Sequence, residues 1–180
     1  PQETASDAGE HGQEQELDLG RIQNDMLEAE NIYKNSIEIA RRIVHDAQLG
    51  VVPDMEAAGN MVENVMESVF KNPDAMVSLA KLREYDEYTY THCINVCVLA
   101  VAMGKHLELK KPVIRLLGLA GLFHDVGKAR IPSTILNKPG KLTDKEFDIM
   151  KNHPDEGYRM LGGAKKVHEQ VLLGALQHHE

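Results

Sequence analysis

The stretch His124-Asp125-Val126-Gly127-Lys128 decides how the rest of this sequence is interpreted. Neighbouring side chains on a helix point about 100° apart, so the adjacent histidine and aspartate can offer one metal ion an imidazole nitrogen and a carboxylate oxygen. The second oxygen of Asp125 can then reach another metal ion. We expect Gly127 to end the helix and Lys128 to lie at the mouth of the site. A lone His-Asp pair is usually accidental, so the interpretation depends on histidines elsewhere in the chain.

Further histidines, each on a separate predicted element, complete a candidate metal site. The candidate ligands are His92, His124, Asp125, His153, His178 and His179. Taken singly, each residue has a simpler interpretation. His92 would be a core histidine and His153 a turn residue, and His178 and His179 would be a frayed helix end or part of a tag. Taken together they predict one site, provided that the helices converge as in bundles that hold metal in the core.

The donor set predicts both the metal and the chemistry. Five imidazoles and a bridging carboxylate favour iron or manganese over magnesium, which prefers oxygen ligands, and zinc stays open. Two metal ions about 3.5–4 Å apart generate a hydroxide and hold a phosphate for in-line attack. We therefore assign catalytic roles to Asp125 and Lys128, the latter binding a non-bridging phosphate oxygen of the substrate.

Charge and composition exclude several classes of protein. The net charge is −8, but residues 1–20 hold six acidic residues and no Lys or Arg, which leaves 22 acidic and 20 basic residues elsewhere. Without a basic stripe we expect no long nucleic-acid partner. No apolar run reaches the roughly 18 residues of a membrane span, and no signal peptide is visible, so we expect a cytoplasmic protein. Cys93 and Cys97 are expected to be small core residues.

Hydrophobic periodicity predicts an all-α fold. The expected domains are an acidic disordered tail (1–19), an N-terminal helical region (20–85) and a metal-dependent phosphohydrolase domain (86–180). The expected helices are 21–49, 54–70, 73–83, 87–106, 111–125, 143–152, 154–162 and 164–179. His153 precedes a proline, which disfavours helical geometry. The N-terminal helices either join the core, which we prefer, or form the seam of a homodimer.

Several strings together resemble one family. The segment from about Glu87 to Glu180 resembles the HD-GYP domain, a branch of the HD phosphohydrolase superfamily. The matching strings are Tyr-Thr-His92-Cys-Ile-Asn-Val, Leu-Phe-His124-Asp125-Val-Gly-Lys128, Ile-Pro-Ser-Thr-Ile-Leu-Asn-Lys138-Pro-Gly-Lys-Leu-Thr, Met-Lys-Asn-His153-Pro-Asp-Glu-Gly157 and His178-His179-Glu180. The resemblance implies an HD-domain helical bundle with an N-terminal extension. It also implies bacterial hydrolysis of cyclic di-GMP to pGpG, and sometimes GMP, at an iron or manganese cluster bridged by Asp125.

Two departures from the family pattern refine this expectation. Members with a third metal ion carry a glutamate where this chain has Tyr88, so we expect two metal ions. The family also continues with an Arg-x-Asp-Gly-x-Gly-Tyr-Pro loop and a later aspartate ligand, and we expect a chain truncated before them. The alternatives are a catalytically weak or inactive signalling protein that binds cyclic di-GMP or a partner, and a hydrolase of another nucleotide.

Overall fold

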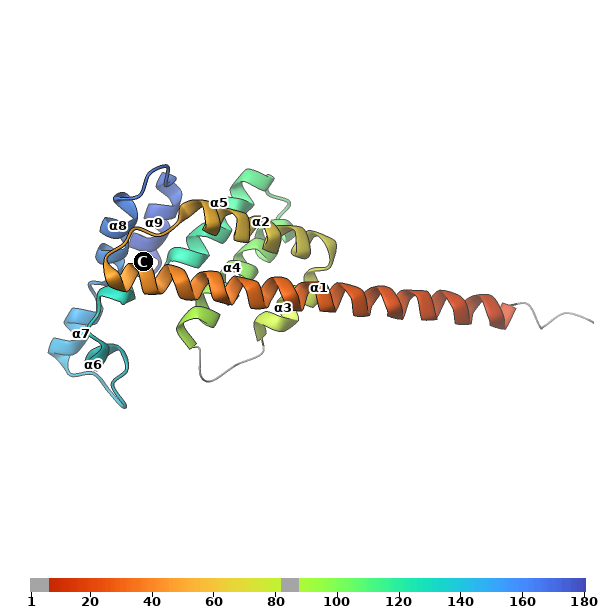
Figure 1. The fold of residues 1–180 in the computed structure, drawn as a ribbon, viewed down its shortest axis with the longest axis horizontal. Helices are drawn as coiled ribbons and strands as arrows, with labels where there is room; N and C mark the ends of the chain where they lie inside the picture. The colour runs from red at the N-terminus through yellow and green to blue at the C-terminus, as the bar shows by residue number, and fades with distance from the viewer. Residues whose placement is uncertain (1–6, 82–87) are drawn as a thin grey trace, which may run out of the picture.

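The structure is a computed structural model that describes residues 7–81 and 88–180; for residues 7–18, 88 and 89 it describes only the backbone. Within these ranges the chain forms helices and no strand, which confirms the predicted all-α class. Figure 1 shows a helical bundle from which one end of the first helix projects. The elements are α1 (Asp7–Leu49), α2 (Met55–Lys71), α3 (Pro73–Lys81), α4 (Tyr88–His106), α5 (Lys111–Phe123), η1 (Val126–Arg130), α6 (Ser133–Leu136), α7 (Asp144–Met150), α8 (His153–Gly162) and α9 (Glu169–Gln177).

The first helix is longer than the sequence pattern predicts. It begins at Asp7 rather than near Arg21, so residues 7–19, which were expected to be disordered, are helical. Glutamate, glutamine and leucine, which dominate 14–17, are good helix formers, and extending an existing helix needs no new nucleus. Residues 1–6 of the predicted tail lie outside the described ranges. The other end agrees with the prediction, because Gly50 takes a φ of 80° directly after the helix.

The N-terminal helices share the core of the C-terminal half. Helices α1, α2 and α3 all contact α4, and α1 also contacts η1. One cluster of buried side chains runs from Ala29 in α1 through Val65 in α2 to Val171 in α9. The preferred interpretation of these helices as part of the core is therefore correct.

The central pair of helices is α4 and α5, and glycine allows their close approach. A Cβ atom built on Gly121 would lie 3.1 Å from backbone atoms of Cys97, so α5 packs directly on the α4 backbone. However, α4 is not buried on every side, although its residues from Val96 to Met103 are all apolar. Leu99 and Met103 on its outer face are 48% and 54% exposed among the described residues.

The segment around the predicted site departs from expectation in two places. Gly127 does not end a helix: α5 ends at Phe123, and Gly127 lies within η1. A Cβ atom on Gly127 would overlap the carbonyl oxygen of His153, so glycine is needed there for close packing of η1 on α8. His153 is the first residue of α8 despite the proline that follows it. Its side chain is buried, and its Nδ1 donates a hydrogen bond to the carbonyl oxygen of Met150, so burial and this local hydrogen bond outweigh the backbone preference that the proline imposes.

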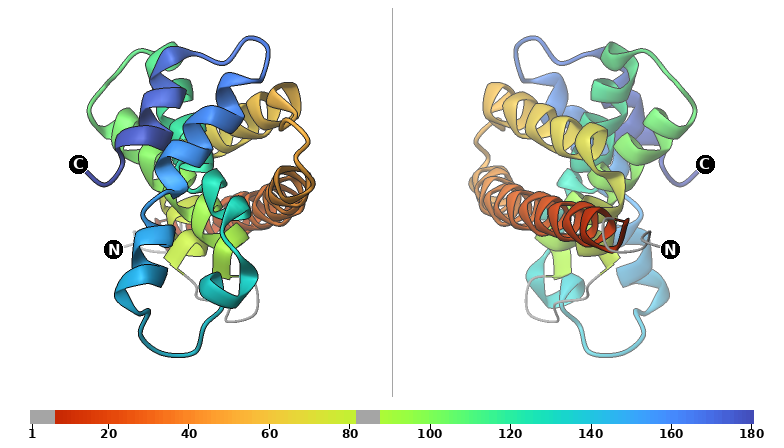
Figure 2. Two further views of the ribbon diagram at one scale, coloured as in Figure 1. Left: turned by 90° about the vertical axis from the view of Figure 1, so that its left-hand side faces the viewer. Right: turned by 90° about the vertical axis from the view of Figure 1, so that its right-hand side faces the viewer.

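Two further differences concern segments near the C-terminal end. The stretch after Arg130 contains the short helix α6, where a loop was expected. The last helix begins at Glu169 rather than near Ala164, because Lys166 takes a φ of 64°, which a helix does not continue through. Figure 2 shows α6 and α7 as an arm beside the bundle.

Among the described helices, none is sufficiently long and apolar to cross a membrane.

Candidate metal centre

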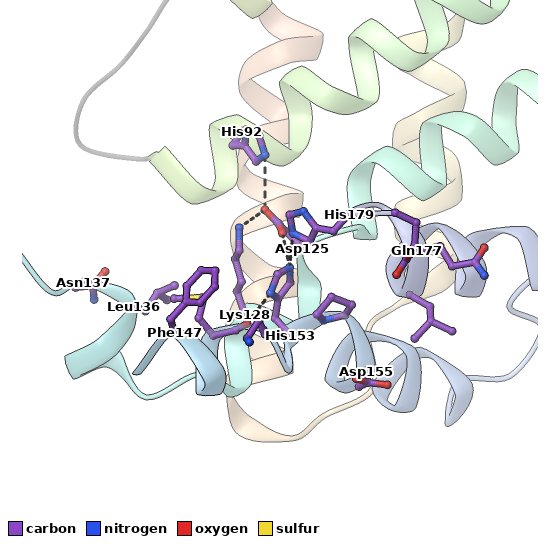
Figure 3. A pocket seen from close by; sticks show the side chains of 15 residues that line it. His92, Asp125, Lys128, Leu136, Asn137, Phe147, His153, Asp155, Gln177 and His179 are labelled. Atoms are coloured by element: carbon purple, nitrogen blue, oxygen red, sulfur yellow. Dashed lines mark hydrogen bonds and ion pairs between the residues drawn. The ribbon is translucent and has the colours of Figure 1, made fainter. Parts of the chain in front are cut away.

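Five different elements bring the predicted site residues together. The contributors are His92 from α4, His124 and Asp125 from the turn after α5, Lys128 from η1, His153 from the start of α8, and His178 and His179 from the end of α9. The other six side chains meet around the carboxylate of Asp125. Figure 3 shows four of them, namely His92, Lys128, His153 and His179. None of the predicted site residues lies elsewhere.

Asp125 separates the histidines into two groups. Its side chain is 4% exposed, and its Oδ2 lies 3.2 Å from Nε2 of His124 and 3.6 Å from Nε2 of His92. Its Oδ1 lies 3.4 Å from Nε2 of His153 and 3.5 Å from Nε2 of His178. Each oxygen of one carboxylate therefore faces its own set of imidazoles.

Both sets have the compactness of a metal site. The donor atoms of Asp125, His153, His178 and His179 all lie within 4.8 Å of one another, and so do those of His92, His124 and Asp125. We call these the four-residue group and the three-residue group. Since Asp125 belongs to both, the two groups form one continuous centre.

Backbone carbonyls fix the tautomer of three of the rings. Nδ1 of His124 lies 2.8 Å from the oxygen of Gly121, and Nδ1 of His153 lies 2.8 Å from that of Met150. Nδ1 of His178 lies 3.0 Å from the oxygen of Ala175, so the same three-residue step back along the chain recurs each time. A carbonyl oxygen only accepts hydrogen bonds, so each Nδ1 carries the proton. In the neutral ring Nε2 then presents a lone pair to the centre.

The lone pairs of His153 and His178 point at each other, an arrangement that a positive charge between the rings would stabilise. Nε2 of His92 lies 3.2 Å from that of His124, and Nε2 of His153 lies 3.1 Å from that of His178. Burial lowers the pKa of His92 and of His178, which disfavours protonation as the source of that charge. Oδ1 of Asp125 is buried without a hydrogen-bond partner in the described part of the chain. The residues present thus fit a centre for divalent metal ions.

Lys128 neutralises the carboxylate from one side. Its Nζ lies 2.6 Å from Oδ2 of Asp125, and its side chain is 28% exposed. Burial raises the pKa of Asp125, but its neighbours His124, His153 and Lys128 together outweigh burial and hold the pKa well below the usual aspartate range. Asp125 is therefore ionised, and Lys128 connects it to the surface.

A large cavity opens beside the centre. Its volume is about 1340 Å³, and its lining includes Asp125, Lys128 and His153 on one side. The arm formed by α6 and α7 lines another side with Leu136 and Phe147 (Figure 3). A substrate in this cavity has access to the carboxylate, the lysine and the imidazoles at once.

The remaining histidines and cysteines lie outside the centre. Among the described side chains, the groups with metal-like spacing include none of His45, His106 and His168. Cys93 and Cys97 are buried free thiols, as predicted, and burial raises the pKa of each to about 12. They therefore stay protonated. The side chain of Tyr88, on which the expectation of two metal ions depends, lies outside the described side chains.

Sequence reasoning missed the residues of the arm that line the cavity. Phe147 and Lys151 belong to the cavity wall, and so does the amide of Asn137. Phe147 and Met150 stand at the helical spacing of a core face, so the sequence carries no signal for a cavity wall. Only the structure shows that α7 buries none of its side chains.

Comparison with known proteins agrees with this geometry. A cyclic di-GMP phosphodiesterase of Pseudomonas aeruginosa is 46% identical over 135 residues, which cover 75% of this chain and 33% of that protein. The cyclic di-GMP phosphodiesterase response regulator RpfG of Xanthomonas campestris pv. campestris is 38% identical over 109 residues (59% and 29%). A 3′3′-cGAMP-specific phosphodiesterase of Vibrio cholerae is 36% identical over 97 residues (52% and 22%).

The chain thus spans about a third or less of the length of these relatives. The sequence profile of the HD domain matches residues 89–180, the half of the chain that carries every residue of the centre. Because this match includes the adjacent His124 and Asp125 together with the remote histidines that meet them, the chain belongs to the HD domain family.

Proposed function

We propose that the protein is a metal-dependent phosphodiesterase that opens cyclic di-GMP to pGpG and can continue to GMP. The observation that carries this proposal is the position of Asp125, whose two oxygens face two separate imidazole groups beside a large cavity. A bridged pair of metal ions suits attack on a phosphodiester. The relatives named cyclic di-GMP phosphodiesterases support the choice of substrate.

The proposed ligands follow the two groups. His153, His178 and His179 would hold one ion, His92 and His124 the other, and Asp125 would bridge them. Imidazole-rich sites with a carboxylate suit iron or manganese, with zinc as a further candidate. When bound, such ions supply Lewis acidity, which lowers the pKa of water and offsets phosphate charge.

The residues of the chain itself contribute orientation and charge. The Nδ1 bonds to backbone carbonyls hold the rings of His124, His153 and His178 in place before any ligand arrives. The ammonium of Lys128 lines the cavity next to Asp125, within reach of a phosphate that lies against the carboxylate. It would bind a non-bridging oxygen and favour the more charged transition state.

The decisive experiment is anaerobic purification followed by metal analysis and a nucleotide product assay. The wild-type protein, loaded with Fe²⁺ or Mn²⁺, is expected to convert cyclic di-GMP to pGpG. Asp125→Asn removes the bridging charge at nearly constant size and is expected to lower turnover at least 100-fold. Asp74→Asn, an exposed carboxylate on α3, is the matched control. Tight binding of cyclic di-GMP by the fully loaded protein, without product, would instead support a signalling protein that only binds it.

We further propose a bacterial cytoplasmic protein that forms a homodimer through its N-terminal helices. Leu19, Ile22 and Met26 follow one face of α1 at helical spacing and are 62%, 48% and 36% exposed. They continue the stripe whose next member, Ala29, is fully buried in the bundle. A second copy of α1 would cover this stripe.

A further inference from the structure

The cavity beside the metal centre is larger than its proposed chemistry requires. Its volume of about 1340 Å³ exceeds the roughly 300–1,000 Å³ typical of sites for drug-sized ligands. Asp125 and Lys128 lie on one side of it, where the reacting phosphate would bind. Leu136, Phe147 and Met150 supply an apolar surface from the arm (Figure 3). This surface has no part in the proposed metal chemistry.

Phe147 has no role in folding that its surroundings reveal. It is 54% exposed, and α7 has no buried side chain. Ile149, on the same helix, is 39% exposed but does not line the cavity. Both side chains are exposed on α7, but only that of Phe147 faces the cavity, so comparing them distinguishes the effect of exposure from the effect of facing the cavity. Of these two residues, Phe147 alone presents a flat π surface to the cavity.

A cation accompanies this aromatic ring. Nζ of Lys151 lies over the ring of Phe147, 5.3 Å from its centroid, and 2.7 Å from Oδ1 of Asp148, and Lys151 also lines the cavity. The lysine side chain is 58% exposed, so it can move from the ring face to the edge of a bound base. A guanine base would then stack on the aromatic side chain, and its O6 and N7 would accept hydrogen bonds from the ammonium.

The backbone connects this surface directly to the metal centre. Lys151 follows α7, and His153 stands two residues later as the first residue of α8. The carbonyl of Met150, in the last turn of α7, accepts the hydrogen bond from Nδ1 of His153. The end of α7 thus orients a candidate metal ligand and also carries the aromatic ring, so a base on Phe147 would have a fixed position relative to the centre.

We propose that Phe147 and Lys151 form a nucleobase subsite, which binds one guanine of a cyclic dinucleotide while the phosphate lies at Asp125 and Lys128. This inference rests on the proposed function and adds the residues that recognise the base. It separates recognition of the phosphodiester, which every cyclic dinucleotide shares, from recognition of the base, which differs between them.

The first test compares three variants of the Mn²⁺-loaded protein: Phe147→Ala, Phe147→Trp and Ile149→Ala. Calorimetry would measure the affinity for cyclic di-GMP, and inorganic phosphate would report on the metal centre alone. Loss of one stacked base is expected to weaken cyclic di-GMP binding by about 5-fold to 100-fold in Phe147→Ala. Phe147→Trp should restore it, Ile149→Ala should leave it unchanged, and all three should bind inorganic phosphate like the wild type.

The second test concerns the choice of base. Lys151→Met removes the donor to guanine O6 and N7 but keeps an unbranched side chain. Adenine offers N7 but carries an amino group in place of O6. The variant is expected to lose affinity for cyclic di-GMP by about 5-fold to 10-fold, with a smaller loss for cyclic di-AMP. Equal losses for the two ligands would remove Lys151 from base recognition.

The outcomes distinguish the subsite from the function on which it depends. Wild-type affinity for cyclic di-GMP in Phe147→Ala, with hydrolysis intact, would overturn the subsite and leave the phosphodiesterase proposal standing. An equal loss of phosphate and cyclic di-GMP binding would place the defect at the metal centre and also overturn it. A wild-type protein that neither binds nor cleaves cyclic di-GMP would refute both proposals. Because Phe147 is more than half exposed, unchanged melting temperatures are expected throughout.

Discussion

Asp125 combines two properties that one residue seldom has, namely burial and a negative charge. Its carboxylate is almost fully buried, yet it must stay ionised to face imidazoles with both oxygens. Lys128 and the surrounding rings make this possible by holding its pKa low. Burial then increases the strength of every interaction that the carboxylate makes.

The unequal size of the two groups predicts ordered metal loading. The four-residue group contains three imidazoles and Asp125, whereas the three-residue group contains two imidazoles and the same carboxylate. More donors give a tighter site, so the first Mn²⁺ ion is expected at His153, His178 and His179. Calorimetric titration with Mn²⁺ should show two binding events of different affinity. His178→Ala should lower the affinity of the tighter event at least 10-fold, and His92→Ala should lower the affinity of the weaker event at least 10-fold. The reverse pattern would contradict this order.

At the residue scale, the sequence predicted which side chains meet but not how they divide around Asp125. The adjacent His124 and Asp125 suggested that the two carboxylate oxygens face different ions, and the strings around His153 and His178 matched a family. No local pattern shows which histidines gather at each oxygen, because this depends on how α4, α8 and α9 meet. The side-chain contact between Lys128 and Asp125 also arises from η1, which the sequence did not predict.

At the element scale, the contact between η1 and α8 is the point at which the centre is most easily disturbed. In Gly127→Ala the new methyl group would collide with backbone atoms of His153 and Gly157. The expected cost is about 1–3 kcal/mol of stability, with weaker metal binding because Asp125 and His153 move apart. Chemical denaturation and metal titration measure the two effects.

Gly162→Ala is the matched control for that variant. Gly162 is also in α8, and a Cβ atom there would meet nothing within 4 Å. Alanine favours a helix over glycine, so this change should be neutral or stabilising by up to about 1 kcal/mol. A similar loss in both variants would show that close packing at Gly127 is not the cause.

The arm depends on a second local arrangement, which has its own pH dependence. Glu146 closes the capping box of α7 with Thr143 and pairs with Lys138. The pKa of Glu146 is lowered from 4.5 to about 2, mainly by the ammonium of Lys138 and further by the hydrogen bonds from Thr143. Because the folded-state pKa is the lower one, the stabilisation is present above pH 4.5 and is lost as the pH falls toward 2. NMR titration of the Glu146 carboxyl should show this pKa.

Lys138→Met tests the cause of that shift. Without the ammonium group, the pKa of Glu146 should rise toward its ordinary value, and the hydrogen bonds from Thr143 should leave it still somewhat low. Lys141→Met changes a nearby exposed lysine and should have no such effect. The capping box itself was readable from sequence, because Thr143 and Glu146 stand at its defining spacing.

At the scale of the whole molecule, the all-α class and the shared core followed from hydrophobic periodicity. The stripes on α1 and α2 have the 3.6-residue period of helices with one buried face. Periodicity gives no signal in residues 7–19, whose sequence is mostly polar, which is why the start of α1 was missed. It also fails on the four-residue helix α6, which is too short to show a period although Ile135 is buried there. Apolar composition does not measure burial either, because Met103 of α4 is exposed.

The proposed dimer makes a prediction at the same scale. Ile22→Glu places a charge in the exposed stripe of α1, whereas Gln23→Glu places the same charge one residue away on the helix. The first should weaken association at least 10-fold, and the second should not, because a buried unpaired charge opposes packing. Sedimentation equilibrium measures the association constant. A wild-type protein that is monomeric at all concentrations would exclude the dimer.

The continuity of α1 has a mechanical consequence. Its 43 residues extend over about 65 Å, and its C-terminal turns lie against η1, where the side chain of Arg130 approaches Gly50. A force or rotation applied at the projecting end would be transmitted along this helix, which α2 and α3 contact, to η1, the five-residue segment that contains Lys128. The helix therefore connects its projecting end mechanically to the segment that carries Lys128.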